Sequence, residues 1–426
     1  MTDHNQTPTS RKRVIVLGGG VIGLCSAYGL QQRGHEVVVL DRSPQKRDGC
    51  SFGNAGLIVP SHFVPLAAPG MIALGLKWLG HPESPFALRP RPSSAMLRWG
   101  WEFWRACAKD RADRAAPVLR DLNMASRQIY EEWADAWGNE FGLAREGLLM
   151  LCRSEHALAE EAGLVRKAAD LGMPAEVLDS RGLASLDPSL QMNVAGGVFF
   201  PRDCHLSPAR LLAGLERRIL EGGGQIVWNA DVQSPRVSGG GLTAVETTQG
   251  TFAGDEFVLA GGVWSDKFAE AVGLRLPLLA GKGYSLTLSA PRVKPRISLI
   301  LVEARVAITP MGETLRFGGT MELGAADERV NPRRVRGIVK SIPSYLPDFR
   351  EDDFAGIAPW SGLRPCSPDG LPYLGRTSRC RNLVVACGHA MMGLSLGPVT
   401  GQVVSQLVSG EAAPLAHPLL SPDRYG

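Results

Sequence analysis

Short apolar runs and amphipathic stretches alternate along most of this chain, and their spacing predicts a mixed α/β protein. Residues 14–17 form an apolar run suited to a strand buried on both faces, and residues 36–40 form a second run of this kind. Between them, apolar side chains recur on one face of a helix that Gly34 is placed to end. By contrast, apolar and polar residues alternate over residues 281–323, which predicts an antiparallel sheet.

The two kinds of pattern are interleaved along the chain. Residues 207–224 have a Ser-Pro start and a Gly stop and predict a helix, and residues 224–232 predict the strand after it. Residues 242–262 are typical of a hairpin that leads into a buried strand. We also expect helices in the first half of 64–200 and at 331–347, and a buried strand before a last helix in the Gly-rich tail. Such interleaving predicts two domains with several crossings between them.

The glycines after the first apolar run point to a nucleotide. Gly18, Gly20 and Gly23 fit G-x-G-x-x-G: the first permits a tight turn, the second lets backbone approach a pyrophosphate, and the third lets helix and strand pack closely. Asp41 ends the second strand, where an acid accepts hydrogen bonds from ribose hydroxyls. NAD, NADP and FAD all remain compatible with this loop. Asp41 disfavours the extra phosphate of NADP, an argument that Arg42 beside it weakens, and the plainer alternative is a turn without nucleotide.

Length, composition and charge narrow the class. With 426 residues, 44% hydrophobic and 21% charged, the chain predicts a soluble globular protein of two domains. A formal net charge of +4 without a Lys/Arg block argues against a nucleic-acid partner. The eight cysteines are scattered without CxxC pairs, so we expect reduced thiols rather than disulfides or zinc, and no metal site. The polar residues 1–12 lack the apolar core of a secretory signal and predict a disordered N-terminus.

Two apolar stretches raise the question of a membrane. Residues 63–80 are interrupted by prolines and a lysine and are too short to span a bilayer. Residues 96–109 carry Trp99, Trp101 and Trp104 among basic residues, a mixture suited to a membrane interface. The alternative, which we favour from sequence, is a helix that packs its aromatic residues into the second domain.

Five motifs in order carry a resemblance to a known family: GGGVIG at 18–23, CSFGNAGLI at 50–58, VLAGGVWS at 258–265, GLRPCSPDGLPYLG at 362–375 and GHAMMGLSLGPVTG at 388–401. Together they resemble the D-amino-acid oxidase superfamily of flavoenzymes, closest to the bacterial D-amino acid dehydrogenases of small-subunit type, over nearly the whole chain from Arg13. The resemblance implies FAD, which we expect to be bound noncovalently. It also implies a Rossmann-like FAD-binding domain interleaved with an α+β substrate domain on an antiparallel sheet. The implied FAD-binding domain comprises 13–63, 205–280 and 356–426, and the substrate domain comprises 64–204 and 281–355.

The resemblance also implies which residues meet the cofactor. The glycines of the first loop would approach the pyrophosphate, Asp41 the ribose and Val232 the adenine, and the 388–396 loop would lie against the pyrimidine edge of the flavin. There, the turn before the last helix is a candidate donor to negative charge on the reduced ring. The full set of implied cofactor contacts is Gly18, Gly20, Val21, Ile22, Gly23, Asp41, Arg42, Ser51, Asn54, Ala55, Gly56, Val232, Gly261, Gly262, Trp264, Gly388, Gly393, Leu394 and Ser395.

Four residues are candidates for contact with a substrate. Arg364 matches the family's carboxylate-binding arginine, and a planar guanidinium can hold both carboxylate oxygens. The alternative for Arg364 is a surface ion pair. Tyr284 and Arg305 lie on the predicted sheet, and each also fits a purely structural role. His389 follows a strand, where it would contact substrate or flavin or simply pack. Cys387 and His389 leave covalent flavin attachment open.

The implied activity is oxidative deamination of D-amino acids, by hydride transfer from the α carbon to flavin, with electrons passed to a quinone or respiratory carrier. The apolar loop 390–392 favours a cyclic or apolar substrate such as D-proline or hydroxy-D-proline. Two alternatives remain: a glycine- or sarcosine-type amine oxidase that uses O2, and a non-catalytic flavin-binding subunit. We expect a cytoplasmic protein or one bound peripherally to the inner face of the cell membrane, and a partner subunit is compatible with the sequence.

Overall fold

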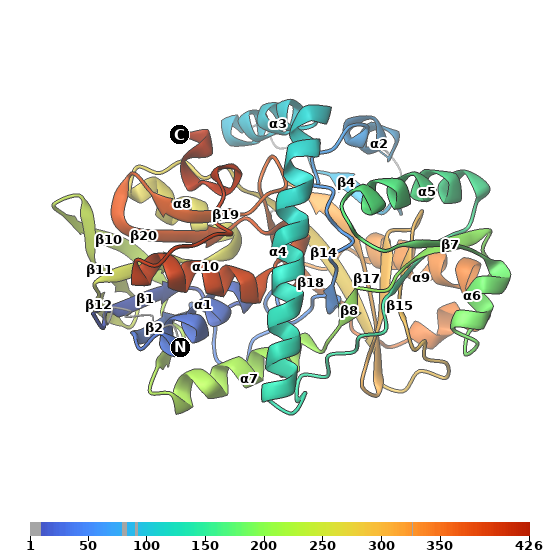
Figure 1. Cartoon of the computed structure of the whole chain (residues 1–426), viewed down its shortest axis with the longest axis horizontal. Helices are drawn as coiled ribbons and strands as arrows, with labels where there is room; N and C mark the ends of the chain where they lie inside the picture. The colour runs from blue at the N-terminus through green and yellow to red at the C-terminus, as the bar shows by residue number, and fades with distance from the viewer. Residues whose placement is uncertain (1–9, 79–82, 90–92, 326) are drawn as a thin grey trace, which may run out of the picture. The chain divides into compact units, whose positions relative to one another are not determined.

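The computed structural model describes residues 10–78, 83–89, 93–325 and 327–426 (Figure 1). The chain divides into two compact units. Unit 1 comprises residues 1–47, 212–278 and 371–426, and unit 2 comprises 48–211 and 279–370. Each unit therefore draws on segments that are distant in the sequence, as the interleaved patterns indicate.

Unit 1 is built on a largely parallel sheet. Its strand order is β19-β20-β13-β1-β2-β9, and every neighbouring pair is parallel except β19 with β20. Helices α1 and α10 pack side by side (Figure 1). The strands are β1 (Arg13–Leu17), β2 (Glu36–Leu40), β9 (Gln225–Val227), β13 (Glu256–Leu259), β19 (Tyr373–Thr377) and β20 (Cys380–Cys387). The helices are α1 (Val21–Gln32), α7 (Pro208–Glu221, most of it in this unit), α8 (Ser265–Ala271) and α10 (Gly397–Ser409).

The apolar runs form strands here because burial on both faces needs no polar alternation. Ile15, Val38, Phe257 and Val385 each lie on a different strand and are completely buried in one core. The hairpin prediction is confirmed by an antiparallel ribbon of β10 (Val232–Ser238), β11 (Gly241–Thr247) and β12 (Gly250–Ala253), after which the chain enters β13. The strand expected at 224–232 is wrong in extent: β9 ends at Val227, and Asn229 turns the chain with a φ of 56°.

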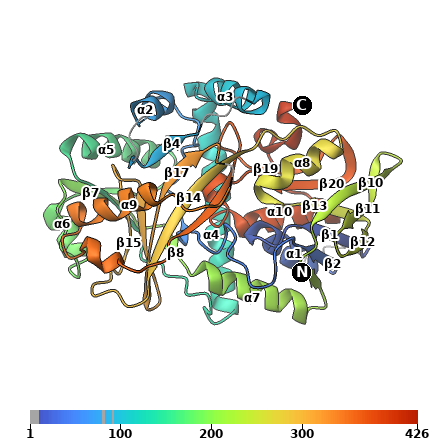
Figure 2. The ribbon, with the colours of Figure 1, turned by 180° about the vertical axis from the view of Figure 1, so that it is seen from behind.

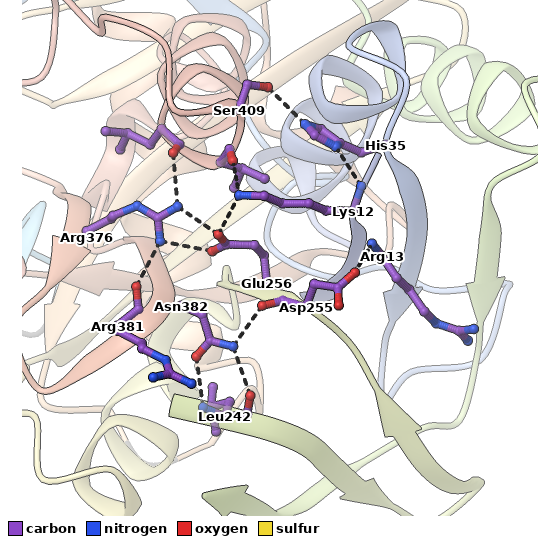
Figure 3. Close-up of polar contacts among 12 residues, drawn as sticks. Lys12, Arg13, His35, Leu242, Asp255, Glu256, Arg376, Arg381, Asn382 and Ser409 are labelled. Carbon is purple, nitrogen blue, oxygen red and sulfur yellow. Dashed lines mark hydrogen bonds and ion pairs between the residues drawn. The ribbon is translucent and has the colours of Figure 1, made fainter. Parts of the chain in front are cut away.

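A charged cluster closes the amino-terminal edge of this sheet (Figure 3). The Glu256 side chain is only 9% exposed and accepts from the Lys12 ammonium at 2.9 Å and from the Arg376 guanidinium at 2.9 and 3.0 Å. Beside it, the Asp255 carboxylate accepts from the Arg13 N–H at 2.7 Å, and the Asn382 amide donates to the Asp255 carbonyl at 2.8 Å. These contacts tie the four strands together at the edge where β1, β13 and β20 begin and β19 ends.

Unit 2 is built on a mixed sheet in the order β18-β14-β17-β16-β15-β5-β7-β6. Strand β4 pairs in parallel with the last three residues of β17. The antiparallel pairing predicted for 281–323 is confirmed for β14, β17, β16 and β15. On its other side, β15 pairs in parallel with β5, which lies outside that range. A separate short pair joins β3 (Leu57–Ile58) to β8 (Cys204–His205). The sheet strands are β4 (Phe86–Leu88), β5 (Leu148–Cys152), β6 (Glu176–Asp179), β7 (Gly196–Phe200), β14 (Leu279–Leu288), β15 (Ser298–Leu301), β16 (Val306–Met311), β17 (Thr314–Leu323) and β18 (Trp360–Cys366).

Helix α9 covers one face of this sheet (Figure 2). Its Ile338, Ile342 and Tyr345 enter one core with Leu286 and Phe317 of β14 and β17. The helices expected in the first half of 64–200 and at 331–347 are confirmed, although strand β4 lies within the first of these stretches. The helices of the unit are α2 (Met71–Trp78), α3 (Ser94–Ala106), α4 (Lys109–Ala136), α5 (Glu155–Asp170), α6 (Ser180–Leu186) and α9 (Pro332–Tyr345).

Several sequence-based expectations need correction. Strand β18 pairs with β14 of unit 2, so residues 360–366 do not join the unit 1 sheet as the bounds at 356–426 imply. Residues 48–63 likewise belong to unit 2. The packing interpretation of the Trp-rich stretch is wrong for two of its three tryptophans, since Trp99 is buried whereas Trp101 and Trp104 are 59% and 57% exposed.

Residues 1–9 and 79–80, which belong to the expected disordered N-terminus and to the apolar stretch, lie outside the described residues. In the part of the chain that the structure describes, no helix is both long and apolar enough to span a membrane. Nor do three or more His, Cys, Asp or Glu side chains gather there in a manner suited to a metal ion. All eight cysteines are free thiols.

Candidate functional site

The glycine loop of unit 1 joins the carboxyl end of β1 to the start of α1. Gly18 has a φ of 117° and donates its N–H to the Leu40 carbonyl at 2.8 Å. A Cβ at Gly18 would collide with the Ala260 carbonyl, and one at Gly23 would collide with the Gly18 carbonyl. Side chains are therefore excluded from the loop by the neighbouring backbone. Gly20 caps α1, whose first turn at Val21 and Ile22 presents N–H groups and the positive end of the helix dipole, as an anionic pyrophosphate requires.

The acid that follows β2 lies beside this loop. The Asp41 carboxylate accepts from the Gly19 N–H at 2.6 Å and from the Ser43 N–H at 2.7 Å. The Arg42 guanidinium lies over the Trp264 ring, 3.5 Å from its centroid. Three of the predicted cofactor contacts therefore lie close together in unit 1: Asp41, Arg42 and Trp264. The turn at Gly261 and Gly262, which follows β13, leads directly into Trp264. Val232 begins β10 instead of ending the strand before it, so its predicted place at a strand end is wrong.

The loop after β20 holds the one orphaned buried polar atom among the residues predicted to bind cofactor or substrate. His389 is 3% exposed, and its Nε2 lies 3.0 Å from the Thr400 hydroxyl, whereas its Nδ1 is buried with no hydrogen-bond partner among the described residues. Burial lowers the pKa of His389 to about 3, so the ring is neutral at any ordinary pH. Gly388, with a φ of 76°, packs against the Tyr373 ring, where a Cβ would lie 2.8 Å from Cδ2.

The turn at 393–396 departs from its predicted role in part. Leu394 and Ser395 are buried, and the Leu396 N–H already donates to the Met392 carbonyl at 2.8 Å. That N–H is therefore not a free donor at the start of α10. Burial raises the pKa of the Cys387 thiol to about 12, which keeps it protonated and disfavours a covalent bond to flavin through this residue.

In unit 2, sheet register places Arg364 on one face together with three glycines. Arg364 pairs with Gly281 and Gly362 pairs with Gly283, so these four positions share a face. A Cβ at Gly283 would overlap the Arg364 guanidinium, which therefore lies directly over this glycine. The guanidinium Nη1 donates to the Thr320 carbonyl at 2.9 Å. Thr320 has a φ of 66°, a conformation that β-branched residues rarely adopt, and it lies where a bulge interrupts the β14–β17 register.

The CSFGNAGLI loop is anchored on this same face. Arg316 pairs with Thr287 and donates to the carbonyls of Phe52 and Asn54, at 2.7 Å each. Burial lowers the pKa of Arg316, and these two carbonyls satisfy the buried guanidinium. The backbone of Asn54, Ala55 and Gly56 is thereby held over the sheet that carries Arg364, with half-buried Ser51 at the start of the loop.

Neither Tyr284 nor Arg305 joins Arg364. Tyr284 alternates with Gly283 on β14 and points to the opposite face, where its hydroxyl donates to the buried Glu322 carboxylate at 2.6 Å. Burial raises the pKa of Tyr284, and the hydroxyl stays protonated. Arg305 is exposed in the turn between β15 and β16, three strands away from β18. The structure thus gives Tyr284 a structural place behind the sheet.

Sequence reasoning missed Arg316, Gly283 and Thr320. Arg316 lies in a stretch where apolar and polar residues alternate, and this alternation is the only sequence signal for the face of the sheet on which its side chain lies. Gly283 and Thr320 become visible only with the register of β14 against its two neighbours.

Comparison with known proteins defines the class. The family model described as FAD dependent oxidoreductase matches residues 13–407, so the chain belongs to this family of flavoenzymes. Its fold class is the predicted one, and its cofactor is FAD: the glycine loop, the start of α1 and the orphaned His389 nitrogen fit a bound dinucleotide.

Individual relatives are similar over their whole length. A D-amino acid dehydrogenase of Rhizobium rhizogenes is 34% identical over 421 residues, covering 97% of this chain and 100% of that protein. A D-amino acid dehydrogenase of Granulibacter bethesdensis is 31% identical over 418 residues, covering 97% and 99%. Among solved structures, glycine oxidase from Geobacillus kaustophilus has a TM-score of 0.78 at 25% identity, covering 98% of this chain and 99% of that one. L-proline dehydrogenase from P. horikoshii shares the fold, with a TM-score of 0.73 at 16% identity over 97% and 98%.

Proposed function

We propose that this protein is an FAD-dependent dehydrogenase of free D-amino acids that yields 2-oxo acids. The relatives named as D-amino acid dehydrogenases support the substrate class, because the similarity covers nearly the full length of both chains. The observation that carries the proposal is the Arg364 guanidinium, held over Gly283 by the Thr320 carbonyl on the face that also bears the CSFGNAGLI loop.

Arg364 would bind the substrate carboxylate. Thr320 occupies one Nη1 donor, and the planar fork retains further N–H groups for two carboxylate oxygens. A fixed carboxylate orients the α carbon and its hydrogen. This orientation raises the rate of hydride transfer, because the reacting atoms are already in position. FAD supplies the chemistry, accepting the hydride of the α C–H bond when bound. The amine nitrogen then forms a C=N bond with the α carbon, and water hydrolyses this free imine, or a cyclic imine from D-proline.

The cofactor contacts proposed from unit 1 are those of the glycine loop, Asp41, Arg42, the turn at Gly261 to Trp264 and the 388–395 loop. From unit 2 we propose the backbone at 51–56. His389 would offer its Nδ1 to cofactor or substrate as a neutral group, because a pKa of about 3 excludes a role as a proton-donating cation near neutral pH.

The proposal also covers the side chain of the preferred substrate and the electron acceptor. Met391 is 45% exposed on the loop beside His389, and a thioether there favours an apolar or cyclic side chain such as that of D-proline. We propose a quinone or respiratory carrier as acceptor, and a place at the inner face of the cell membrane. The competing function is an amine oxidase that uses O2, which the 25% identity to a glycine oxidase favours. Stoichiometric hydrogen peroxide during turnover would decide for the oxidase.

Substitution of Arg364 tests the carrying observation. In Arg364→Ala, the KM for D-amino acids should rise by about 100-fold or more, because a charge-assisted bidentate contact is lost, while the FAD content stays unchanged. Arg364→Lys should recover part of the loss. Arg329→Ala, which removes a guanidinium that is 90% exposed in the same unit, is the matched control. An unchanged KM in Arg364→Ala would refute the assignment.

A further inference from the structure

Helix α3 has two apolar faces, and only one of them packs against the protein. The inner face carries Trp99, Phe103 and Ala106. Trp99 is 5% exposed, its Nε1 donates to the Cys366 carbonyl at 3.0 Å, and its ring stacks on Phe103 with centroids 5.2 Å apart. These contacts join the inner face of the helix to unit 2.

The outer face carries Leu97, Trp101 and Trp104, at helical spacings of four and three residues. They are 75%, 59% and 57% exposed, and the two indoles stack on each other with centroids 5.0 Å apart. We name these three residues the α3 outer face. Single exposed apolar side chains are normal on protein surfaces, but three large ones in one stripe mark a site of interaction.

The charges around this stripe are mainly positive. Arg98 and Arg105 are exposed on α3, and Lys109 and Arg111 are exposed in the next turn, at the start of α4. Of the acids nearby, Glu102 pairs with Arg105 at 3.5 Å and Asp110 pairs with Arg114 at 3.4 Å. Indoles flanked by arginines are the composition of a helix that lies in the headgroup region of a membrane.

We propose that the α3 outer face binds the surface of a bilayer that contains anionic lipid, with Trp101 and Trp104 inserted at headgroup level and Arg98 and Arg105 against lipid phosphates. In Figures 1 and 2, α2 lies beside α3, and its Ile72 adds another exposed apolar side chain. A second copy of the chain fits less well, because a symmetric contact through this stripe brings the arginines of both copies together. This inference rests on the proposed function in one respect: membrane binding would give the enzyme access to an electron acceptor in the membrane.

Vesicle flotation with the full-length FAD-loaded protein tests the proposal. Vesicles of phosphatidylcholine with phosphatidylglycerol should bind at least about tenfold more protein than vesicles of phosphatidylcholine alone, and added salt should weaken binding. The double variant Trp101→Gln/Trp104→Gln should lose binding, and Arg98→Gln/Arg105→Gln should lose the preference for anionic lipid. Leu220→Gln, which alters an apolar residue 52% exposed on α7, is the matched control and should bind as the unaltered protein does.

Three outcomes would overturn the proposal: no flotation of the unaltered protein, unchanged flotation of the tryptophan variant, or a dimer in light scattering that this variant dissociates. Turnover of D-amino acids with a soluble dye is measured in parallel and should not change in either double variant. Because the dye needs no membrane, failure of that turnover in the unaltered protein would count against the proposed function and would leave the vesicle result standing.

Discussion

The glycine loop of unit 1 and the Arg364 face of unit 2 are built in opposite ways. The loop is formed by neighbours in sequence, and its shape is set by backbone that leaves no room for side chains at Gly18 and Gly23. The Arg364 face is assembled from β14, β17 and β18, and two of its residues, Gly281 and Arg364, lie 83 positions apart. In the first region, function follows from absent side chains, and in the second from one long side chain held in place.

This contrast predicts different failures. Changes in the loop should remove the cofactor, whereas changes at Arg364 or Gly283 should leave the cofactor bound and weaken only the binding of substrate. Residues that merely hold one of the units together should lower stability without either effect.

The largest effect is expected at the glycine loop. Gly23→Ala places a methyl group against the Gly18 carbonyl, which cannot move without distorting the turn at the start of α1. The purified variant should be colourless, with FAD affinity lowered by about 1,000-fold or more by absorbance titration. Gly163→Ala, at an open helical position of α5, is the control and should keep its flavin. A Gly23→Ala protein that still binds FAD and is yellow would contradict the role given to the glycine loop.

A stability effect without a cofactor effect is expected at the other edge of the same sheet. Glu256→Ala removes the acceptor shared by Lys12 and Arg376, whose side chains are 30% and 32% exposed. Since both cations can reach water, the cost should be about 2 kcal/mol, below that of breaking a fully buried pair. Denaturant unfolding should report this loss while the flavin spectrum stays normal. Loss of FAD in this variant would show that the two edges are not independent.

The buried groups near β8 give a pH dependence of stability. Burial lowers the pKa of His205 from 6.5 to about 4 and raises the pKa of Asp203 from 3.8 to about 7. As pH falls from 6.5 to about 4, the unfolded chain binds the His205 proton and the folded one does not, so the free energy of unfolding falls. Asp203 has the opposite effect: as pH falls below about 7, the folded protein binds the Asp203 proton before the unfolded chain does, so this group raises the free energy of unfolding.

His205→Gln should therefore reduce the loss of stability between about pH 7 and pH 5, and Asp203→Asn should increase it, each by up to about 2 kcal/mol. Urea unfolding at the two pH values measures both variants. Equal slopes in all three proteins would contradict the burial of these groups.

The smallest effect is expected at Gly283. A Cβ in Gly283→Ala displaces the Arg364 guanidinium, which is the end of a flexible side chain and can shift at modest cost. The KM for D-amino acids should rise by about tenfold, with kcat and FAD content nearly unchanged. Gly318→Ala on β17 is the control, since its Cβ would meet Ala55 at an ordinary 3.5 Å. Equal KM values in the two variants would mean that Gly283 does not position Arg364.

The same contrast explains how far the sequence could predict this protein. The glycine loop, Asp41 and the last strand and helix follow from local patterns, because the features that define them lie within a few residues of one another. Arg364 was found by motif, but Pro365 and its neighbouring glycines obscure the alternation of β18, so its sheet was misassigned. Tyr284 lies on the predicted sheet, but the sequence does not say which face it occupies, because a shift of one position inverts the face of a strand residue. Trp101 and Trp104 were misjudged because helical spacing alone does not say which of two apolar faces is covered.

Anaerobic mixing of the purified FAD-loaded protein with D-amino acids, their L enantiomers and the matching amines without a carboxylate tests the central claim most directly. Absorbance of the oxidised flavin should be lost rapidly with D-amino acids, D-proline among them, and at least about 100-fold more slowly with the amines. Bleaching at equal rates with and without the carboxylate, or with L enantiomers only, would contradict the account.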